Sequence, residues 1–108
     1  MGLSQYDVCL VQLDPTVGKE IKKTRPCLIL SPDEMNEFSH TIIIAPMTTK
    51  DHLEIPTRIR TKFQKKIGWI ALDQLGSIDK RRITKTLGAI NRTCISKIKA
   101  VLKEMLID

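Results

Sequence analysis

The sequence predicts a mostly β protein that ends in one amphipathic helix, and three observations lead to this prediction. Five or six short runs rich in β-branched and apolar residues alternate with turn residues, a pattern typical of strands. The last segment changes to helical spacing. The chain has 108 residues, the length of one domain, so residues 1–108 form a single unit. A sheet this small must curl to protect its edges, and we therefore expect a small, strongly bent antiparallel barrel.

The first half of the chain predicts three strands and a short helix. Residues 6–13 form the first strand, which ends at the turn Asp14-Pro15, and residues 26–30 form the second. The stretch Ser31-Pro32-Asp33-Glu34 predicts a helix start with Ser31 as the N-cap. Residues 41–47 are an almost continuous β-branched run, which predicts a strand that is buried on both faces.

The second half predicts three more strands before the final helix. Residues 55–61 alternate, with Ile59 on one face and Arg58 and Arg60 on the other. Residues 69–73 and 84–90 also resemble strands. Beyond them, one apolar stripe at helical spacing comprises Ile95, Ile98, Val101, Leu102, Met105 and Leu106. Such a stripe is usually core packing, and only rarely a catalytic scaffold or a partner groove.

Charge is distributed unevenly along the chain. Residues 1–57 carry five Lys and Arg against eight Asp and Glu, whereas residues 58–108 carry thirteen against four. This asymmetry indicates either a polyanionic partner or a well-solvated basic surface. Aromatic residues make up only 4% of the chain, so we do not expect a stacking platform for single strands. A nucleic acid would be held mainly through its phosphates and by polar side chains.

The sequence gives no sign of a metal site, a cofactor site or a membrane segment. The three cysteines, Cys9, Cys27 and Cys94, lie in apolar stretches without metal-ligand spacing, so we expect small buried side chains in a reducing compartment. His40 and His52 have no ligand partner at suitable spacing. No apolar run is long enough to span a bilayer, and a cytoplasmic location is expected.

A series of short motifs resembles the MazF/PemK family of toxin endoribonucleases. The matching residues are Asp7-Val8, Leu13-Asp14-Pro15-Thr16-Val17-Gly18, Glu20, Thr24-Arg25-Pro26, Ser31-Pro32, Ala45-Pro46-Met47-Thr48-Thr49, Leu72-Asp73-Gln74 and Ser77-Ile78-Asp79-Lys80. Each motif alone is weak, but their order and spacing cover nearly the whole chain. One departure is Tyr6, where the family usually has a glycine.

The resemblance implies a fold, an activity and partners. The fold is an SH3-like barrel of the MazF/PemK/CcdB type, and the protein is a homodimer. The activity is sequence-specific, metal-independent cleavage of single-stranded RNA, including mRNA, by attack of the ribose 2′-OH to give 2′,3′-cyclic phosphate and 5′-OH ends. The partner is a cognate antitoxin with an acidic, disordered tail. Two other functions remain open: a gyrase poison on the same fold, and a non-catalytic SH3-like RNA-binding module.

Three residues are candidates for the chemistry. Arg25 can stabilise a phosphorane, because a guanidinium matches phosphate oxygens and stays charged, although it is a poor general base on its own. Thr48 matches the catalytic threonine or serine of the family, and its hydroxyl can donate to the phosphate or orient the 2′-OH. Glu20 matches a loop carboxylate and is a candidate base. The simpler alternatives are a strand-end arginine, a turn-capping threonine and an ion pair of Glu20 with a neighbouring lysine.

Some members of the family use an aspartate with an arginine two residues before it as base and acid. Asp73 matches that aspartate, but Ala71 stands in the arginine position, so the Arg25 and Thr48 arrangement is the better match. Gln74 has both a donor and an acceptor with which to read a base edge. The residues expected to contact RNA are Lys22, Lys23, Thr49, Lys65, Lys66, Asp73, Gln74, Arg81 and Arg82.

Overall fold

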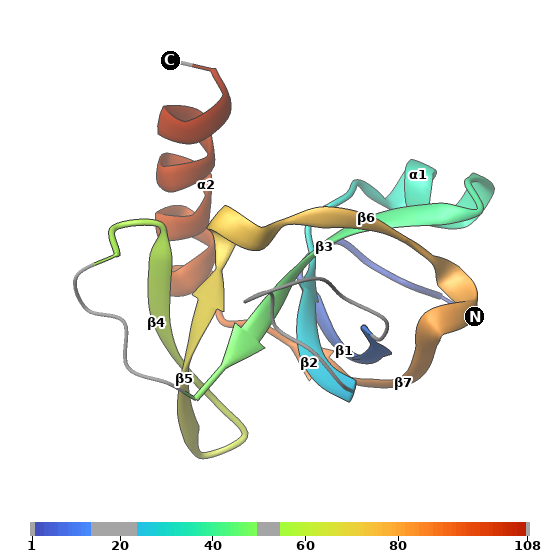
Figure 1. The fold of residues 1–108 in the computed structure, drawn as a ribbon, viewed down its shortest axis with the longest axis horizontal. Helices are drawn as coiled ribbons and strands as arrows, with labels where there is room; N and C mark the ends of the chain where they lie inside the picture. Colours follow the sequence, from blue (N-terminus) through green and yellow to red (C-terminus); the bar gives the residue numbers. More distant parts are fainter. Residues whose placement is uncertain (1, 14–23, 50–54, 108) are drawn as a thin grey trace.

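The computed structural model describes residues 2–13, 24–49 and 55–107. Figure 1 shows a curled sheet with one long helix standing at one end. The elements in chain order are β1 (Asp7–Gln12), β2 (Thr24–Ile29), α1 (Asp33–Phe38), β3 (Thr41–Thr48), β4 (Arg58–Phe63), β5 (Lys66–Ala71), the 3-10 turn η1 (Leu72–Gln74), β6 (Gly76–Asp79), the 3-10 turn η2 (Lys80–Arg82), β7 (Ile83–Ala89) and α2 (Arg92–Leu106). The predicted fold class, mostly β with a C-terminal helix, is confirmed.

The sheet follows the order β4-β5-β3-β2-β1-β7, with β6 added beside β3, and its strand pairs are antiparallel. The sheet curls until the tip of the β4–β5 hairpin reaches β7. There Gln64 Nε2 donates to the carbonyl oxygen of Leu87 at 3.0 Å. The ring of Phe63 lies beside Gly88, where an added Cβ would be 3.5 Å from it. The two end strands therefore meet through side chains of the hairpin, which protects the sheet edges from other chains.

The three central strands, β1, β2 and β3, contribute buried residues to both faces of the sheet, and for β3 the apolar run at residues 41–47 predicted this. Alternate residues divide between two cores because successive side chains in a strand point to opposite faces. One core contains Val8, Leu28 and Ala45, and α2 packs on it. The other core contains their chain neighbours, including Cys9, Ile29 and Ile44.

The final helix forms where the spacing predicted it. Its N-cap is Asn91, whose side chain accepts a hydrogen bond from the backbone N–H of Cys94 at 2.9 Å. Such a cap stabilises a helix by about 1 kcal/mol. Cys94 and Ile98 are the buried part of the apolar stripe, and Ile98 is fully inaccessible. Burying an isoleucine side chain contributes about 1.5–3 kcal/mol, so α2 is held mainly by this face.

Two predictions about elements are wrong, and one strand was not predicted. Pro32, not Ser31, takes the N-cap position of α1. The Ser31 hydroxyl is buried instead, donating to Asn36 Oδ1 at 2.5 Å and accepting from the N–H of Ile43 at 3.0 Å, which ties α1 to β3. The strand predicted at residues 69–73 begins earlier and ends at Ala71, because the chain turns into η1. The strand β6 was not anticipated.

Tyr6, at the position where the resemblance led us to expect a glycine, has a left-handed backbone conformation with φ of 72°. A left-handed conformation is uncommon for a bulky side chain. Two hydrogen bonds hold it: Tyr6 N–H donates to the carbonyl oxygen of Ile29 at 2.8 Å, and Ile90 N–H donates to the carbonyl oxygen of Tyr6 at 3.0 Å. The entry into β1 therefore keeps its shape, and the partly buried ring packs against the core under α2.

The three cysteines are free and buried, as expected from their apolar surroundings. Cys9 and Cys27 lie directly opposite each other on β1 and β2. Burial raises the pKa of the Cys9 thiol to about 11, with a smaller contribution from the negative charge of Asp7. Burial, followed by the neighbouring Cys9, raises the pKa of Cys27 further. Both side chains therefore remain protonated thiols at neutral pH and serve as packing groups.

Candidate active site

A cavity of about 210 Å³ lies where the β4–β5 hairpin meets the ends of β2 and β3. Its lining combines a polar and an apolar set of side chains. The polar set is Arg25, Thr48, Thr49, Thr61, Gln64 and Lys66. The cavity therefore brings together four of the residues that the sequence predicted for the site: Arg25, Thr48, Thr49 and Lys66.

The pairing of β2 with β3 explains why Arg25 and Thr48 meet. Cys27 is paired with Pro46 in this antiparallel ladder. The paired residues end there, and Arg25 and Thr48 lie two positions further along their strands, where both line the cavity. Arg25 is half-buried and Thr48 is 9% exposed. A cation and a hydroxyl from segments far apart in sequence thus lie at one strand end.

The tip of the β4–β5 hairpin forms one wall of the cavity. Phe63 pairs with Lys66, so only Gln64 and Lys65 make the turn. Both have positive φ, 49° and 67°, although neither is glycine. Two-residue hairpins favour such angles because they match the twist of the strands, and Asn-Gly is the usual sequence. The turn holds Gln64 and Lys66 at the cavity and leaves Lys65 exposed beside it.

Gly68 lets β5 approach β3 at the base of the cavity. A Cβ at this position would lie 3.0 Å from the backbone carbonyl oxygen of Thr48. Real Cβ atoms rarely come so close to a backbone atom that cannot move aside. A larger residue at position 68 would push the backbone of Thr48 away, so the position of Thr48 in the site depends on this glycine. It also places no side chain opposite Thr61, which is its partner on β4.

Asp73 lies at the other end of the same hairpin and is joined to Arg58. Arg58 Nε donates to Asp73 Oδ1 at 2.7 Å, and Nη2 donates to Oδ2 at 3.2 Å. Arg58 pairs with Ala71 across the β4–β5 ladder, so the neighbouring strand supplies the arginine that the sequence lacks at position 71. Partial burial would raise the pKa of Asp73, but hydrogen bonds and attraction from Arg58 outweigh it and lower that pKa.

This pairing makes Asp73 a poor candidate for a general base. A base works best when its pKa lies near the operating pH, and the pKa of Asp73 moves the other way. Asp73 also does not belong to the lining of the cavity that holds Arg25 and Thr48. Gln74 follows it in η1, half-buried.

The remaining predicted residues lie elsewhere. Arg82 Nη1 donates to the carbonyl oxygens of Gln12 and Leu13 at 3.5 and 3.4 Å, close to the end of β1. Arg81 is exposed and pairs with Asp79 at 2.9 Å, and its hydrogen bonds hold the pKa of Asp79 at about 2. Neither arginine lines the cavity with Arg25. The predicted site residues Glu20, Lys22 and Lys23 lie outside the described residues.

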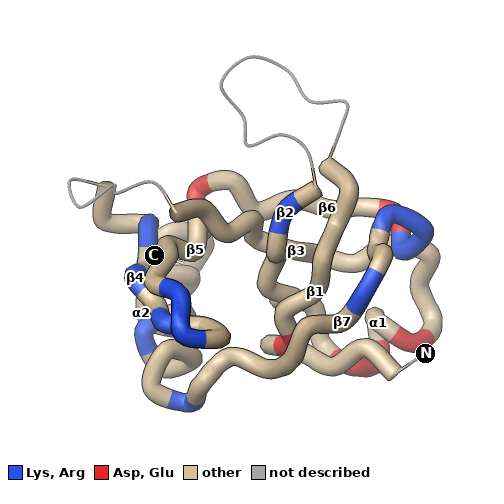
Figure 2. Tube along the Cα trace, turned by 90° about the horizontal axis from the view of Figure 1, so that it is seen from below, with Lys and Arg blue, Asp and Glu red and all other residues tan. Residues whose placement is uncertain are grey.

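The charges separate over the molecule as they do along the chain. Figure 2 shows acidic positions at α1 and close to the N-terminal side, and basic positions over β4, the hairpin tip and α2. A second basic group follows η2 into β7, and a basic position in β2 lies between the two groups (Figure 2). Arg25 is the basic residue of that strand. The cavity thus lies on the basic side of the molecule.

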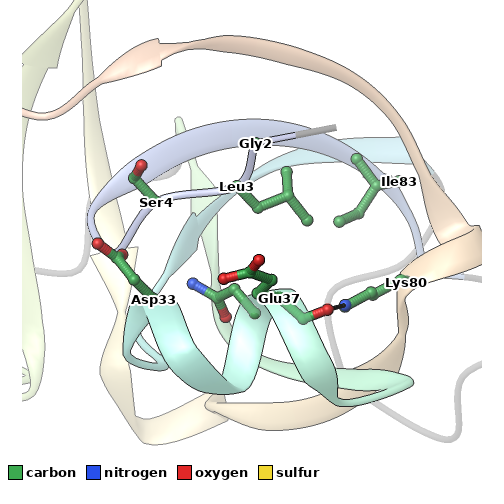
Figure 3. Close-up of a pocket in the computed structure, with 8 residues that line it drawn as sticks. Gly2, Leu3, Ser4, Asp33, Glu37, Lys80 and Ile83 are labelled. Atoms are coloured by element: carbon green, nitrogen blue, oxygen red, sulfur yellow. Dashed lines mark hydrogen bonds between the residues drawn. The ribbon is translucent and has the colours of Figure 1, made fainter.

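A larger hollow of about 700 Å³ lies between the N-terminal segment, α1 and η2 (Figure 3). Two carboxylates, Asp33 and Glu37, line it together with Lys80. Asp33 Oδ1 accepts from the N–H of Gln5 at 2.7 Å, and Lys80 Nζ donates to the backbone oxygen of Glu37 at 3.3 Å. Its carboxylates make this hollow a poor site for a polyanion, and neither Arg25 nor Thr48 lines it.

Sequence reasoning missed the hairpin's contribution to the cavity, namely Thr61, Phe63, Gln64, Ile67 and Gly68. The available signal was the polar pair Gln64-Lys65 between two alternating runs, but the pair lacks the usual turn glycine. It also missed Arg58 as the partner of Asp73. Only the pairing of β4 with β5 brings those two residues together.

Two negative findings apply to the described residues alone. No group of three or more His, Cys, Asp or Glu side chains in residues 2–13, 24–49 and 55–107 is placed to hold a metal ion. In the same ranges, neither helix has the length and apolar character that crossing a membrane requires.

Comparison with known proteins identifies the family. Endoribonuclease EndoA of Bacillus subtilis (strain 168) is 31% identical over 109 residues, which cover 95% of this chain and 93% of the relative. Crystalline MazF (Form-I) from Deinococcus radiodurans has the same fold, with a TM-score of 0.87 at 20% identity over 98% of this chain and 97% of that chain. An endoribonuclease in complex with its cognate antitoxin from a Mycobacterial species gives a TM-score of 0.80 at 20% identity, covering 96% and 94%. The model of the PemK-like, MazF-like toxins of type II toxin–antitoxin systems matches residues 4–106, and this chain belongs to that family.

Proposed function

We propose that this toxin is an endoribonuclease that cleaves single-stranded RNA at short sequences without a metal ion. The observation that carries the proposal is the cavity in which Arg25, Thr48 and Lys66 meet on the basic side of the molecule. The name of its relative from Bacillus subtilis, an endoribonuclease, supports the same activity. Messenger RNA in the cytoplasm is the expected substrate.

The proposed reaction uses the substrate's own ribose as the nucleophile. The 2′-oxygen attacks the adjacent phosphorus while its proton passes to a base. The bond from phosphorus to the 5′-oxygen then breaks, and an acid gives that oxygen a proton. The products are a 2′,3′-cyclic phosphate and a 5′-OH end. This route needs no activated water and no redox partner.

Arg25 and Thr48 have different roles in this reaction. Negative charge develops on the phosphoryl oxygens of the phosphorane, and the guanidinium of Arg25 donates to them from a half-buried position. Thr48 lies across from it and donates its hydroxyl proton to the phosphate or orients the 2′-OH. Lys66 adds a second positive charge at the wall of the cavity. The low pKa of Asp73 favours Glu20 over Asp73 as the base.

The test uses an oligoribonucleotide and chelator. The wild type should cut it in the presence of EDTA, and mass spectrometry should find cyclic phosphate and 5′-OH ends. Replacing the ribose at the cut site by deoxyribose should abolish cleavage and leave binding nearly intact. Arg25→Ala should lower the rate on the order of 10²–10³-fold. Glu20→Gln tests the base. Cleavage of the deoxy substrate, or loss of activity with EDTA, would contradict the proposal.

We further propose that the active form is a two-fold dimer. Large apolar side chains remain exposed on the single chain, namely Phe38, Ile67, Leu106 and Ile107. A closed two-fold interface is the commonest way to bury such surface. Light scattering at micromolar concentration should report twice the mass of the chain, and a monomer would contradict the proposal.

The partner that we propose is an antitoxin with an acidic, disordered tail that occupies the RNA site. The family's toxin–antitoxin pairing and the basic side around the cavity support this. A tail that mimics RNA needs negative charge and little structure of its own. Antitoxin peptide and a deoxy-substituted oligoribonucleotide should therefore exclude one another in fluorescence anisotropy. Simultaneous binding would mean that inhibition acts elsewhere.

A further inference from the structure

The wall of the cavity includes a buried polar atom to which the proposed reaction gives no role. Thr61 is only 6% exposed, and its Oγ1 is fully covered and has no hydrogen-bond partner. A buried hydroxyl without a partner destabilises a fold, and such groups are few in native proteins. An unpaired hydroxyl in the wall of the candidate active site therefore indicates a functional role.

Thr61 lies close to the backbone of the proposed catalytic threonine. Its partner on β5 is Gly68, so no side chain stands opposite it on the same face. The backbone of Thr48 occupies that place, because its carbonyl oxygen would be 3.0 Å from a Cβ added to Gly68. The Thr61 side chain is therefore part of the cavity wall next to Thr48.

The other walls suit a flat, partly apolar group. The apolar lining is Pro26, Met47, Phe63, Ile67 and Leu87. A volume of about 210 Å³ corresponds to roughly seven water molecules at their share of the liquid, which is enough for one nucleobase. Proteins that read single-stranded RNA hold unstacked bases against apolar or aromatic side chains and bond their edges. Phe63 provides such a side chain here.

We propose that this cavity receives one unstacked base next to the scissile phosphate, and that the Thr61 hydroxyl forms a hydrogen bond with its edge. This inference rests on the proposed RNA cleavage and adds a specificity-determining residue to it. The hydroxyl is covered in the free protein, so a side chain of the cavity wall has to shift before the base reaches it. The bond that is missing in the free protein then forms only with a base of matching edge.

The experiment compares three variants on a pool of RNA oligonucleotides of random sequence. Thr61→Val keeps the shape and removes the hydroxyl, while Thr61→Ser keeps the hydroxyl and removes the methyl group. Thr86→Val is the matched control, because Thr86 is an exposed strand threonine outside the cavity lining. Sequencing of the cut ends gives the base preference at each position, kinetics on the best substrate give kcat/KM, and thermal unfolding gives Tm.

The expected result separates specificity from structure. Thr61→Val should lose preference at one position beside the cut and lose about tenfold in kcat/KM, the usual value of one neutral hydrogen bond. Its Tm should equal or exceed that of the wild type, because no bond of the free protein is lost. Thr61→Ser should keep the wild-type preference, and Thr86→Val should match the wild type throughout.

Two results would overturn the inference while leaving the proposed function intact. In the first, the wild type cuts RNA and the Thr61→Val variant cuts it with the same base preference. In the second, the Thr61→Val variant has a lowered Tm, which would show that the hydroxyl is paired in the free protein. A wild type that does not cut RNA would instead refute the proposed function, and this inference with it.

Discussion

Arg58 and Asp73 form a bidentate ion pair in which the arginine is nearly buried and the aspartate is more exposed. The side chain of Arg58 is 7% exposed, whereas that of Asp73 is 33% exposed. A guanidinium withdrawn from water depends on its carboxylate, since removing one partner leaves an uncompensated charge. The pair therefore holds together the open end of the β4–β5 hairpin, opposite the turn. This role is structural even if Asp73 also contacts RNA.

Asp73→Asn should lower the free energy of unfolding by about 1–3 kcal/mol at neutral pH, the range for losing a hydrogen bond to a charged group. Arg58 lowers the pKa of Asp73 in the folded state, so this stabilisation is present above the unfolded pKa of about 3.8 and is lost as pH falls through the lower folded value. Urea unfolding of both proteins between pH 7 and about 3 should show a difference that shrinks below about pH 4.

The control is Asp79→Asn, which alters the exposed pair with Arg81. Salt and water screen that pair, so the substitution should change stability little at physiological ionic strength. A pH-independent loss in Asp73→Asn would contradict the assignment, because it would point to packing rather than charge.

Tyr6 shows a limit of reasoning from residue identity. A tyrosine in place of the expected glycine raised doubt about the turn before β1, yet the backbone has the left-handed φ of 72°. Backbone hydrogen bonds from two distant strand ends determine this conformation, and the sequence around Tyr6 does not contain them. In the same way, Ala71 could not reveal that Arg58 lies opposite it.

The hairpin turn Gln64-Lys65 is the element most at odds with local sequence preference. Both residues adopt left-handed angles that cost a residue with a side chain about 1 kcal/mol relative to glycine. Residues held in such conformations cluster at functional sites, and this turn forms a wall of the proposed active site. Glycines in this turn would remove the conformational cost, but they would also remove the long polar side chains of Gln64 and Lys65.

Lys65→Gly should therefore stabilise the free protein by about 1 kcal/mol, because glycine adopts φ of 67° without steric cost. Chemical denaturation measures this gain. The matched change Lys66→Gly removes the same side chain from a strand position of β5 and should destabilise the protein by roughly 0.5–1 kcal/mol. Lys65→Gly should also weaken RNA binding if Lys65 contacts a phosphate. A less stable Lys65→Gly would mean that the turn is not strained.

Prediction from sequence succeeded where one element has one clear pattern. The continuous run of β3 is buried as its pattern predicted. The stripe correctly located α2, although Ile98 is its only fully buried member and Leu106 is exposed. Ser31 was misassigned because its hydroxyl bonds across to β3 rather than along α1. Gly76–Asp79 was missed as a strand because only pairing with β3 makes it one. Arg25 and Thr48 were identified by resemblance, but the cavity between them is made by a hairpin whose contribution has no local motif.

At the scale of the molecule, the basic surface comes from several elements that fold together. The hairpin tip brings Lys65 and Lys66 to the ends of β2 and β3, while Arg81 and Arg82 follow η2 on the other side of Arg25. Charge counts along the chain indicated a polyanionic partner, but they could not show that the basic residues form two separate groups on the surface. Whether a single RNA strand runs past both is a question that salt dependence can answer, because each phosphate contact releases counterions.

The wild type should bind single-stranded RNA with an affinity that falls steeply with salt. About four phosphate contacts around the cavity give a slope of roughly −3 in log K against log[salt], at about 0.7 per contact. Lys66→Gln should reduce the slope by about 0.7, because Lys66 lines the cavity. Lys103→Gln, in the last turn of α2, is the control and should leave it unchanged. Anisotropy titrations of a deoxy-substituted oligonucleotide between about 50 and 400 mM salt would measure all of these slopes.

A further variant, Arg81→Gln, tests the path of the RNA. If it also reduces the slope, the RNA extends over η2. If only substitutions of the hairpin lysines reduce it, the path is confined to the cavity side. A binding constant that stays flat over this range would rule out an electrostatic RNA site.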